Sequence, residues 1–437
     1  MYHIFFVPLR SKYECMQLDK LKVSAPEILR MIPDEELAKL ANDTKVDYCA
    51  KALKGERLFY LLVYSFLCTD KISQRKLETV FASPQFKTMF NFAVDMKASH
   101  SSISTRLSKI DLSFFENAYE LIYKEFSRLY SEKEVCSKNL IRVDSSMVAE
   151  AGNRLKKGFT VGNKPKDKEA RKQIKYTMAY DGFSVKLAEV FSDSKYLSED
   201  IAMPEVVMSL IKKDKNHENL YVFDRGMVAS NNYDAIDREG AFFIGRIKTS
   251  RKITVVESLL KEDTEKDLGK LELVDDVIVY LLDKGQVERQ EHKYRIVKAK
   301  FKVLRDTTRP NNKGKVKRVE NEVYFITNNF EMSAQEIAEA YRMRWDIEVF
   351  FKFLKQELSF SHFLSTNENG IKVILYMTLI TAMLIMIYKR KNEIGYSDAK
   401  FCFKIEMEAW ITALSITIAG GDVSKFSDRY RIRTRIP

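Results

Sequence analysis

A series of short apolar segments between residues 139 and 248 constrains the fold of this chain more than any other feature. Three strand-like segments rich in β-branched and aromatic residues come first, a segment with helical spacing follows, and two further strand-like segments flank a short helical one. In chain order the longer segments are NLIRVDSS (139–146), IKYTMAYD (174–181), FSVKLAEVFS (183–192), IAMPEVVMSLIKK (201–213), NLYVFDRG (219–226) and AFFIGRIK (241–248). This order predicts an α/β fold with a mixed sheet.

The regions on either side of these segments have different patterns. Residues 1–135 carry apolar residues at helical spacing, for example in 58–67, 74–83 and 111–130, which predicts a small helical bundle. The segment 101–110 begins with Ser and Thr and has the spacing of a helix that could lie in a DNA groove. We therefore interpret 1–135 as a helical DNA-binding or dimerisation region.

A β-rich insertion is predicted for residues 247–320, because VDDVIVYLLD (274–283) and HKYRIVKAKFKVLRD (292–306) alternate as antiparallel strands do. NEVYFITNN (321–329) then predicts a strand that ends in turn residues. Ser333 and Glu336 form a capping-box pattern, so we expect a helix to begin there and to continue through residue 348. The core would thus comprise residues 136–246 and 321–365.

A helical C-terminal region is expected for residues 366–437. Its segment 373–388 has sixteen residues without a charge, whereas a membrane span needs about 20. We favour a buried helix over a membrane-associated one and expect no membrane partner.

Two aspartates follow apolar strand segments: Asp144 follows LIRV, and Asp224 follows LYVF. We interpret both as acids at strand ends, where a carboxylate is well supported and still reaches solvent. A strand-terminal cap or a surface position is the alternative for each one. With a third acid they would offer the hard oxygen ligands that Mg²⁺ or Mn²⁺ prefers. Two such ions roughly 4 Å apart can support in-line attack on phosphorus.

The segment YRMRWDIEVFFKFLKQEL (341–358) supplies that third acid. On one continuous helix at about 100° per residue, four polar side chains fall within an arc of about 60°. They are Tyr341, Arg344, Glu348 and Lys355. Asp346 points away from this arc, so Glu348 is the better candidate ligand. An adjoining stripe of Ile347, Phe351, Leu354 and Leu358 would seat the helix on the core. A solvated charged face is the alternative interpretation.

The overall charge of the chain indicates a polyanionic partner. Its 437 residues include 73 Lys and Arg against 61 Asp and Glu, for a formal charge of +12. Basic residues concentrate in 154–176, 298–318 and the tail 429–437. Five scattered cysteines without a CxxC pair predict reduced thiols, and the N-terminus lacks a signal-peptide pattern. We therefore expect a cytoplasmic protein that associates with nucleic acid.

The spacing of Tyr341, Arg344, Glu348 and Lys355 resembles the YREK signature of bacterial insertion-sequence transposases with a DDE active site. The resemblance implies an RNase H-like catalytic domain in which a β-rich insertion separates the second acid from the final Glu. It implies that Asp144, Asp224 and Glu348 are catalytic and bind metal, with Mg²⁺ or Mn²⁺, in two ions, as cofactor.

By the same resemblance, Tyr341, Arg344 and Lys355 would contact the phosphates near the cleaved DNA end. Arg225 and Trp345 are further candidate DNA contacts. Trp345 could stack on an unpaired base or pack half-buried against the protein.

The expected function is transposition of a mobile element: metal-dependent cleavage at the element ends and strand transfer into target DNA. The partners implied are double-stranded DNA with terminal inverted repeats, target DNA, and a second copy of the chain in a homodimer on DNA. The alternatives are an RNase H-like structure-specific DNA nuclease and a domesticated DNA-binding protein that no longer turns over.

Overall fold

The computed structural model describes residues 22–69, 71–129, 139–150, 154–161, 171–215, 218–282, 292–302 and 321–424. Parts of the basic segments 154–176 and 298–318, and the whole tail 429–437, lie outside these residues.

The predicted α/β core is confirmed. β1 (Asn139–Ala149), β3 (Lys172–Tyr180) and β4 (Val185–Phe191) form an antiparallel meander. β5 (Asn219–Phe223) then pairs parallel with β1, and β6 (Phe242–Ile247) pairs parallel with β5. The connections are α8 (Glu199–Asp214) and α9 (Ser230–Arg238). The spatial order β4-β3-β1-β5-β6 is that of an RNase H-like sheet.

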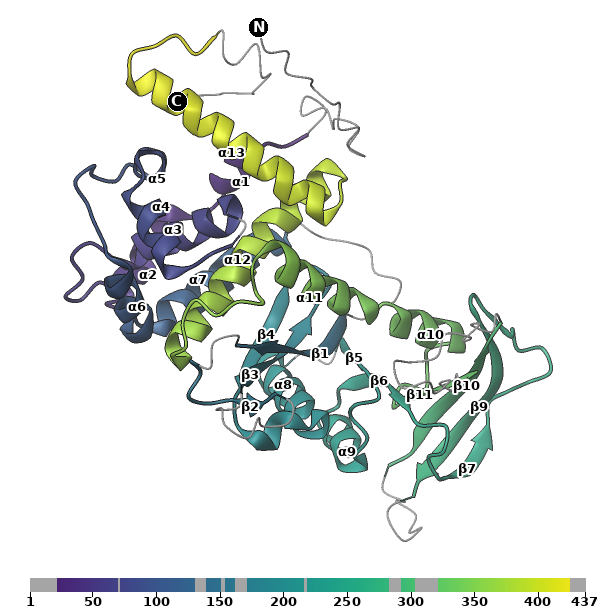
Figure 1. Ribbon diagram of the computed structural model, residues 1–437. Helices are drawn as coiled ribbons and strands as arrows, with labels where there is room; N and C mark the ends of the chain where they lie inside the picture. The colour runs from purple at the N-terminus through teal and green to yellow at the C-terminus, as the bar shows by residue number, and fades with distance from the viewer. Residues whose placement is uncertain are drawn as a thin grey trace, which may run out of the picture.

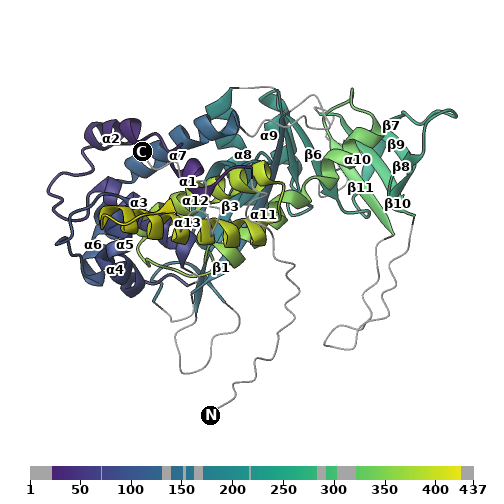
Figure 2. The same ribbon diagram turned by 90° about the horizontal axis from the view of Figure 1, so that it is seen from above.

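The predicted β-rich insertion extends this sheet (Figures 1 and 2). Beyond β6 the order continues through β11 (Glu322–Thr327), β10 (Tyr294–Phe301), β9 (Leu271–Leu281) and β7 (Ile253–Ser258). The short β8 (Asp267–Leu268) pairs with β9, and β2 (Phe159–Thr160) pairs with β3. Because β11 pairs antiparallel with β6, the insertion is joined to the core by main-chain hydrogen bonds.

Helices cover the amino-terminal part of the described chain, as expected. They are α1 (Ala25–Leu29), α2 (Asp34–Asp43), α3 (Gly55–Cys68), α4 (Gln74–Ala82), α5 (Pro84–Met89), α6 (His100–Lys109) and α7 (Leu112–Ser127). In α6, Ile103 and Leu107 are buried, and Arg106 donates to the carbonyls of Val46 and Leu53. The role of α6 in DNA binding and the division into domains stay predictions.

The long apolar helix α12 (Glu368–Asn392) forms the centre of the largest apolar cluster. In Figure 1 it lies between the amino-terminal helices and the sheet. It is the one helix among the described residues that is long and apolar enough to cross a membrane, yet 89% of its most apolar window is buried in the protein. This agrees with the predicted buried helix. α13 (Tyr396–Ile418) packs beside it.

Candidate active site

The two strand acids are neighbours in the sheet. Val143 and Phe223 are the last residues paired between the parallel strands β1 and β5, and Asp144 and Asp224 follow them directly. Neighbouring strands lie about 4.8 Å apart. Side chains alternate along a strand, so both acids are on the face opposite to Val143 and Phe223. That face is covered by α10 (Ala334–Arg342) and α11 (Trp345–Glu357).

The placement predicted for Asp144 at a strand end is wrong. Asp224 does follow the end of β5, but β1 continues five residues past Asp144 to Ala149. β1 loses its neighbour β5 at this point and stays paired with β3, where Asp144 lies opposite Met178. Asp144 is accessible because one side of the strand becomes free there.

The single helix predicted from Ser333 through Glu348 is in fact two helices. The capping box of Ser333 and Glu336 is present, but α10 ends at Arg342 and α11 begins at Trp345. Between them the backbone tightens into i→i−3 bonds, from Arg344 N to the Tyr341 carbonyl (3.0 Å) and from Ile347 N to the Arg344 carbonyl (3.3 Å). Both residues at the junction keep right-handed helical angles, so the polar arc stays on one side.

Arg142 on β1 contacts the junction between α10 and α11. Its side chain is buried, and it donates to the Met343 carbonyl (3.3 Å) and reaches Asp346 Oδ2 at 3.5 Å. Asp346 therefore belongs to a structural ion pair. Glu348, one helical turn after Arg344, contacts the guanidinium that also reaches Asp144.

Arg344 links the carboxylates. Its guanidinium contacts Glu348 Oε1 at 2.5 Å and Asp144 Oδ2 at 3.6 Å, and it lies 5.8 Å from the centre of the Tyr341 ring. Burial lowers the pKa of Arg344, but Tyr341 and the surrounding acids outweigh this effect, so the pKa is raised overall. Tyr341 in turn donates from its hydroxyl to Asp224 Oδ1 (3.1 Å). Arg344 and Tyr341 thus tie all three acids into one cluster.

The comparison with known families shows which family the chain belongs to. The family described as the transposase DDE domain matches residues 136–384, more than half of the chain. The chain belongs to this transposase family. Its matched region contains all three acids and both helices of the site.

Relatives named as transposases show the same likeness over shorter stretches. A transposase of Sinorhizobium fredii is 30% identical over 183 residues, 41% of this chain and 46% of the relative. The transposase for insertion sequence element IS4SA of Synechocystis is 31% identical over 93 residues, 20% of this chain and 28% of the relative. The chain thus spans less than half the length of the curated relatives it matches.

A solved structure of a piggyBac transposase synaptic complex with hairpin DNA aligns with 95% of this chain and 86% of its own chain. The sequence identity is 11% and the TM-score is 0.46.

Burial shifts the titration of the Asp144 carboxyl. It raises the pKa of the Asp144 carboxyl to about 6, and Glu348 and Glu199 add to the rise. The backbone N–H of Ser145, which donates to Asp144 Oδ1 at 2.8 Å, and the guanidinium of Arg344 act in the opposite direction. The loss of solvation on burial thus outweighs the two groups that favour the charged form.

This titration predicts how pH affects stability without added metal. Between about pH 4 and pH 6 the folded chain holds a proton on Asp144 that the unfolded chain has released. The free energy of unfolding of the wild type, relative to Asp144→Asn, should therefore fall with rising pH across this window, by at most about 3 kcal/mol, and stay level above it. Urea titrations of the wild type and Asp144→Asn at several pH values measure this difference in the free energy of unfolding. A difference that rises across the same window would contradict the assignment.

The chemistry of the three carboxylates suits a divalent cation, but their present spacing does not. Asp144, Asp224 and Glu348 offer only carboxylate oxygens, the ligands that Mg²⁺ and Mn²⁺ prefer. Within the described part of the chain, however, no three acidic, His or Cys side chains lie close enough together to hold a metal ion. Arg344 lies between Asp144 and Glu348 instead. Metal binding therefore requires the carboxylates to draw together and Arg344 to shift.

The remaining predicted site residues are placed differently. Lys355 donates to the Met147 carbonyl (3.2 Å), and burial lowers its pKa. Trp345 is 60% exposed at the start of α11, which does not match the half-buried packing alternative. Arg225 is exposed directly after Asp224. Their contacts with DNA stay proposals.

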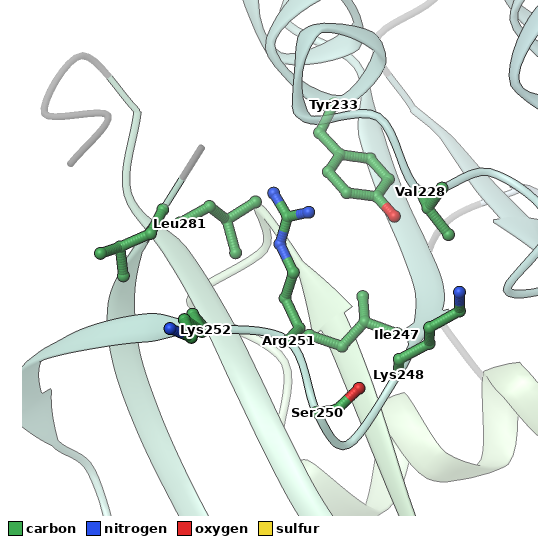
Figure 3. A pocket seen from close by; sticks show the side chains of 9 residues that line it. Val228, Tyr233, Ile247, Lys248, Ser250, Arg251, Lys252 and Leu281 are labelled. Atoms are coloured by element: carbon green, nitrogen blue, oxygen red, sulfur yellow. The ribbon is translucent and has the colours of Figure 1, made fainter. Parts of the chain in front are cut away.

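A basic pocket that the sequence did not reveal lies beyond the end of β6 (Figure 3). Its volume is about 330 Å³, and its walls include the apolar side chains of Ile247 and Leu281 and the ring of Tyr233. Its cations are Lys248, Arg251 and Lys252. Arg251 donates to Ser230 Oγ at 2.6 Å. Because β6 is parallel to β5, this pocket lies at the same edge of the sheet as Asp224.

Glu199, the first residue of α8, was not among the predicted site residues. It lies against the turn after Asp224, on the face of the sheet opposite to α10 and α11. The pattern SED at 198–200 signals only a helix start with acidic residues in its first turn. Nothing in this pattern shows that Ser145 on β1 and the turn after β5 lie beside this helix. Finding this contact from sequence requires the strand order.

Proposed function

We propose that the chain is the DNA transposase of a bacterial insertion sequence, which cleaves the element ends and joins them to target DNA. The observation that carries this proposal is the convergence of Asp144, Asp224 and Glu348 on one edge of an RNase H-like sheet, around the buried Arg344. Family membership supports the reaction class, and the preponderance of basic residues supports a DNA partner.

In the proposed reaction Asp144, Asp224 and Glu348 would hold Mg²⁺ or Mn²⁺. When bound, two such ions activate a water or a 3′-hydroxyl for attack and stabilise the leaving oxygen. Arg344 presents a planar fork suited to a phosphate oxygen, and Tyr341 holds Asp224 in a fixed orientation. Trp345 is free to stack on a base beside the cut.

The decisive assay for this proposal is strand transfer. Purified protein is incubated with Mg²⁺, a linear DNA carrying the inverted repeats that flank the coding region, and a target plasmid. Joined products support a transposase. Hydrolysis without joining would favour the RNase H-like nuclease, and binding without cleavage would favour a domesticated DNA-binding protein.

Because two ends are joined in one event, we propose a homodimer on DNA. Light scattering of the complex measures its mass.

The basic pocket at the end of β6 lies at the same edge of the sheet as the acids but on the face of Val143 and Phe223, so it offers a path for DNA around that edge. Extending the register of β5 and β6, in which Phe223 pairs with Gly245, puts the Cα atoms of Asp224 and Lys248 about 8 Å apart. Lys248 and Lys252 are exposed, and no described acid forms an ion pair with either. A phosphate backbone that leaves the acids could therefore run over this pocket.

Removing the two lysines should weaken DNA binding in a salt-dependent way. Lys248→Ala with Lys252→Ala should reduce the slope of log affinity against log salt by about 1 to 2, because each neutralised phosphate contributes about 0.9. Fluorescence anisotropy at several salt concentrations measures this slope. Lys212→Ala with Lys391→Ala removes the same charge from exposed positions elsewhere and should leave it unchanged. Equal slopes of log affinity against log salt for the two double variants would show that DNA does not run over this pocket.

A further inference from the structure

We propose that Glu199 is a positioning residue that holds the strand segments carrying Asp144 and Asp224 in a fixed relation to each other. The proposal rests on the function proposed above for those two acids. It concerns the face of the sheet opposite to α10 and α11, where α8 packs against β1 and β3.

Glu199 is itself held by a buried lysine. Lys175 on β3 is 1% exposed, and its Nζ donates to Glu199 Oε1 (2.9 Å) and to the Leu197 carbonyl (2.8 Å). A buried ammonium group is costly unless it is paired, so it restrains its acidic partner strongly. The carboxylate of Glu199 is therefore fixed at the start of α8 and does not sample solvent freely.

The second carboxylate oxygen reaches the strand next to Asp144. Glu199 Oε2 accepts from Ser145 Oγ (2.7 Å), and that hydroxyl also lies 2.9 Å from Thr177 Oγ1 on β3. Ser145 in turn donates its backbone N–H to Asp144 Oδ1 (2.8 Å). Because β1 has lost its neighbour β5 at this point, these bonds replace the missing ladder as a restraint on Asp144.

The aliphatic part of the same side chain lies against the turn after Asp224. A Cβ added to Gly226 would come within 2.9 Å of both Cβ and Cγ of Glu199. The next residue of α8 continues this contact, since Asp200 Oδ1 accepts from the N–H groups of Val228 (2.6 Å) and Ala229 (2.9 Å). The first turn of α8 thus supports the loop that begins at Asp224.

The carboxylate of Glu199 is already engaged by protein donors. Both of its oxygens accept hydrogen bonds in the described structure, one from Lys175 and one from Ser145. A supporting role therefore fits its geometry better than a role as a fourth ligand.

Two double variants of the 437-residue chain test the proposal. Lys175→Met with Glu199→Gln and Lys175→Met with Glu199→Leu both remove the buried charge pair and keep an extended side chain at each position. Only the first of these leaves a hydrogen-bond acceptor for the Ser145 hydroxyl.

We expect the Gln variant to cleave end DNA within about threefold of the wild type. We expect the Leu variant to lose about 100-fold in single-turnover rate, because a displacement of about 1 Å can cost that much, with unchanged DNA affinity and thermal midpoint.

Gly226→Ala tests the second contact and should reproduce the loss seen in the Leu variant, since the added methyl group pushes against Glu199. Equal cleavage by the Gln and Leu double variants would overturn the proposal.

Hydrogen–deuterium exchange without DNA or metal separates this outcome from a failure of the proposed function. Peptides that cover 144–147 and 224–229 should exchange faster in the Leu variant than in the Gln variant, even if the wild type cuts no DNA. Identical exchange in these peptides would overturn the positioning role, whatever the activity.

Discussion

Asp144→Asn, Asp224→Asn and Glu348→Gln each reduce Mg²⁺-dependent cleavage and joining by roughly 10³-fold or more, while DNA affinity stays within a few-fold. Each change keeps the size of the side chain and removes the negative charge that a divalent cation needs. None of the three carboxylates is fully buried, so the neutral variants should fold. Gel assays of nicking and strand transfer measure the loss, and fluorescence anisotropy measures the binding.

Asp346→Asn is the matched control for this prediction. It lies on the same helix as Glu348, two residues earlier, but its carboxylate pairs with Arg142 and is more than half exposed. Its neutral variant should retain cleavage within a few-fold. If Asp346→Asn were inactive and Glu348→Gln active, the assignment of the helix acid would be wrong.

Arg344→Lys and Arg344→Met give the second large effect, a loss of roughly 10² to 10³-fold in cleavage. The lysine keeps the charge but not the planar fork that contacts Glu348 and Asp144, and the methionine loses both. The methionine variant also leaves two carboxylates without their shared cation. It should therefore unfold at a lower temperature than the wild type at pH 8 without metal, and Mn²⁺ should restore much of the difference.

Arg342→Met is the control for this effect. Arg342 is an exposed residue at the end of α10 whose ion pair with Glu339 lies on the helix surface. Surface pairs of this kind contribute about 0 to 1 kcal/mol. We expect its activity and thermal midpoint to stay close to the wild type. Full activity in Arg344→Lys would show that the fork is not used on phosphate.

Much of the fold could be predicted because local pattern and tertiary structure agree. The runs around Ile141 and Val222 are apolar enough to be buried strands, and the helical spacing in 201–213 matches α8. Strand order was less accessible, because pairing of β11 with β6 depends on contacts between residues 77 to 83 positions apart.

The two errors at the site have physical causes outside the local sequence. The polar pair Ser145 and Ser146 reads as a strand end, but β3 supplies hydrogen-bond partners that extend β1 to Ala149. YRMRW contains no Gly or Pro to mark a helix boundary. The tight turn at Met343 and Arg344 coincides instead with the contact from Arg142 on β1, which no helical pattern contains. The joint role of Asp144, Asp224 and Glu348 stays a prediction, and Arg344 and Tyr341 link the three side chains.

A crystal of the protein with an end DNA and Mn²⁺ tests the central claim most directly. Anomalous density for manganese identifies the metal regardless of the fitted chain. We predict density between Asp144, Asp224 and Glu348, with the Arg344 guanidinium withdrawn from Asp144 toward a DNA phosphate. Density elsewhere on the protein, or an Arg344 that still bridges Asp144 and Glu348 with DNA in place, would contradict a catalytic role for these carboxylates.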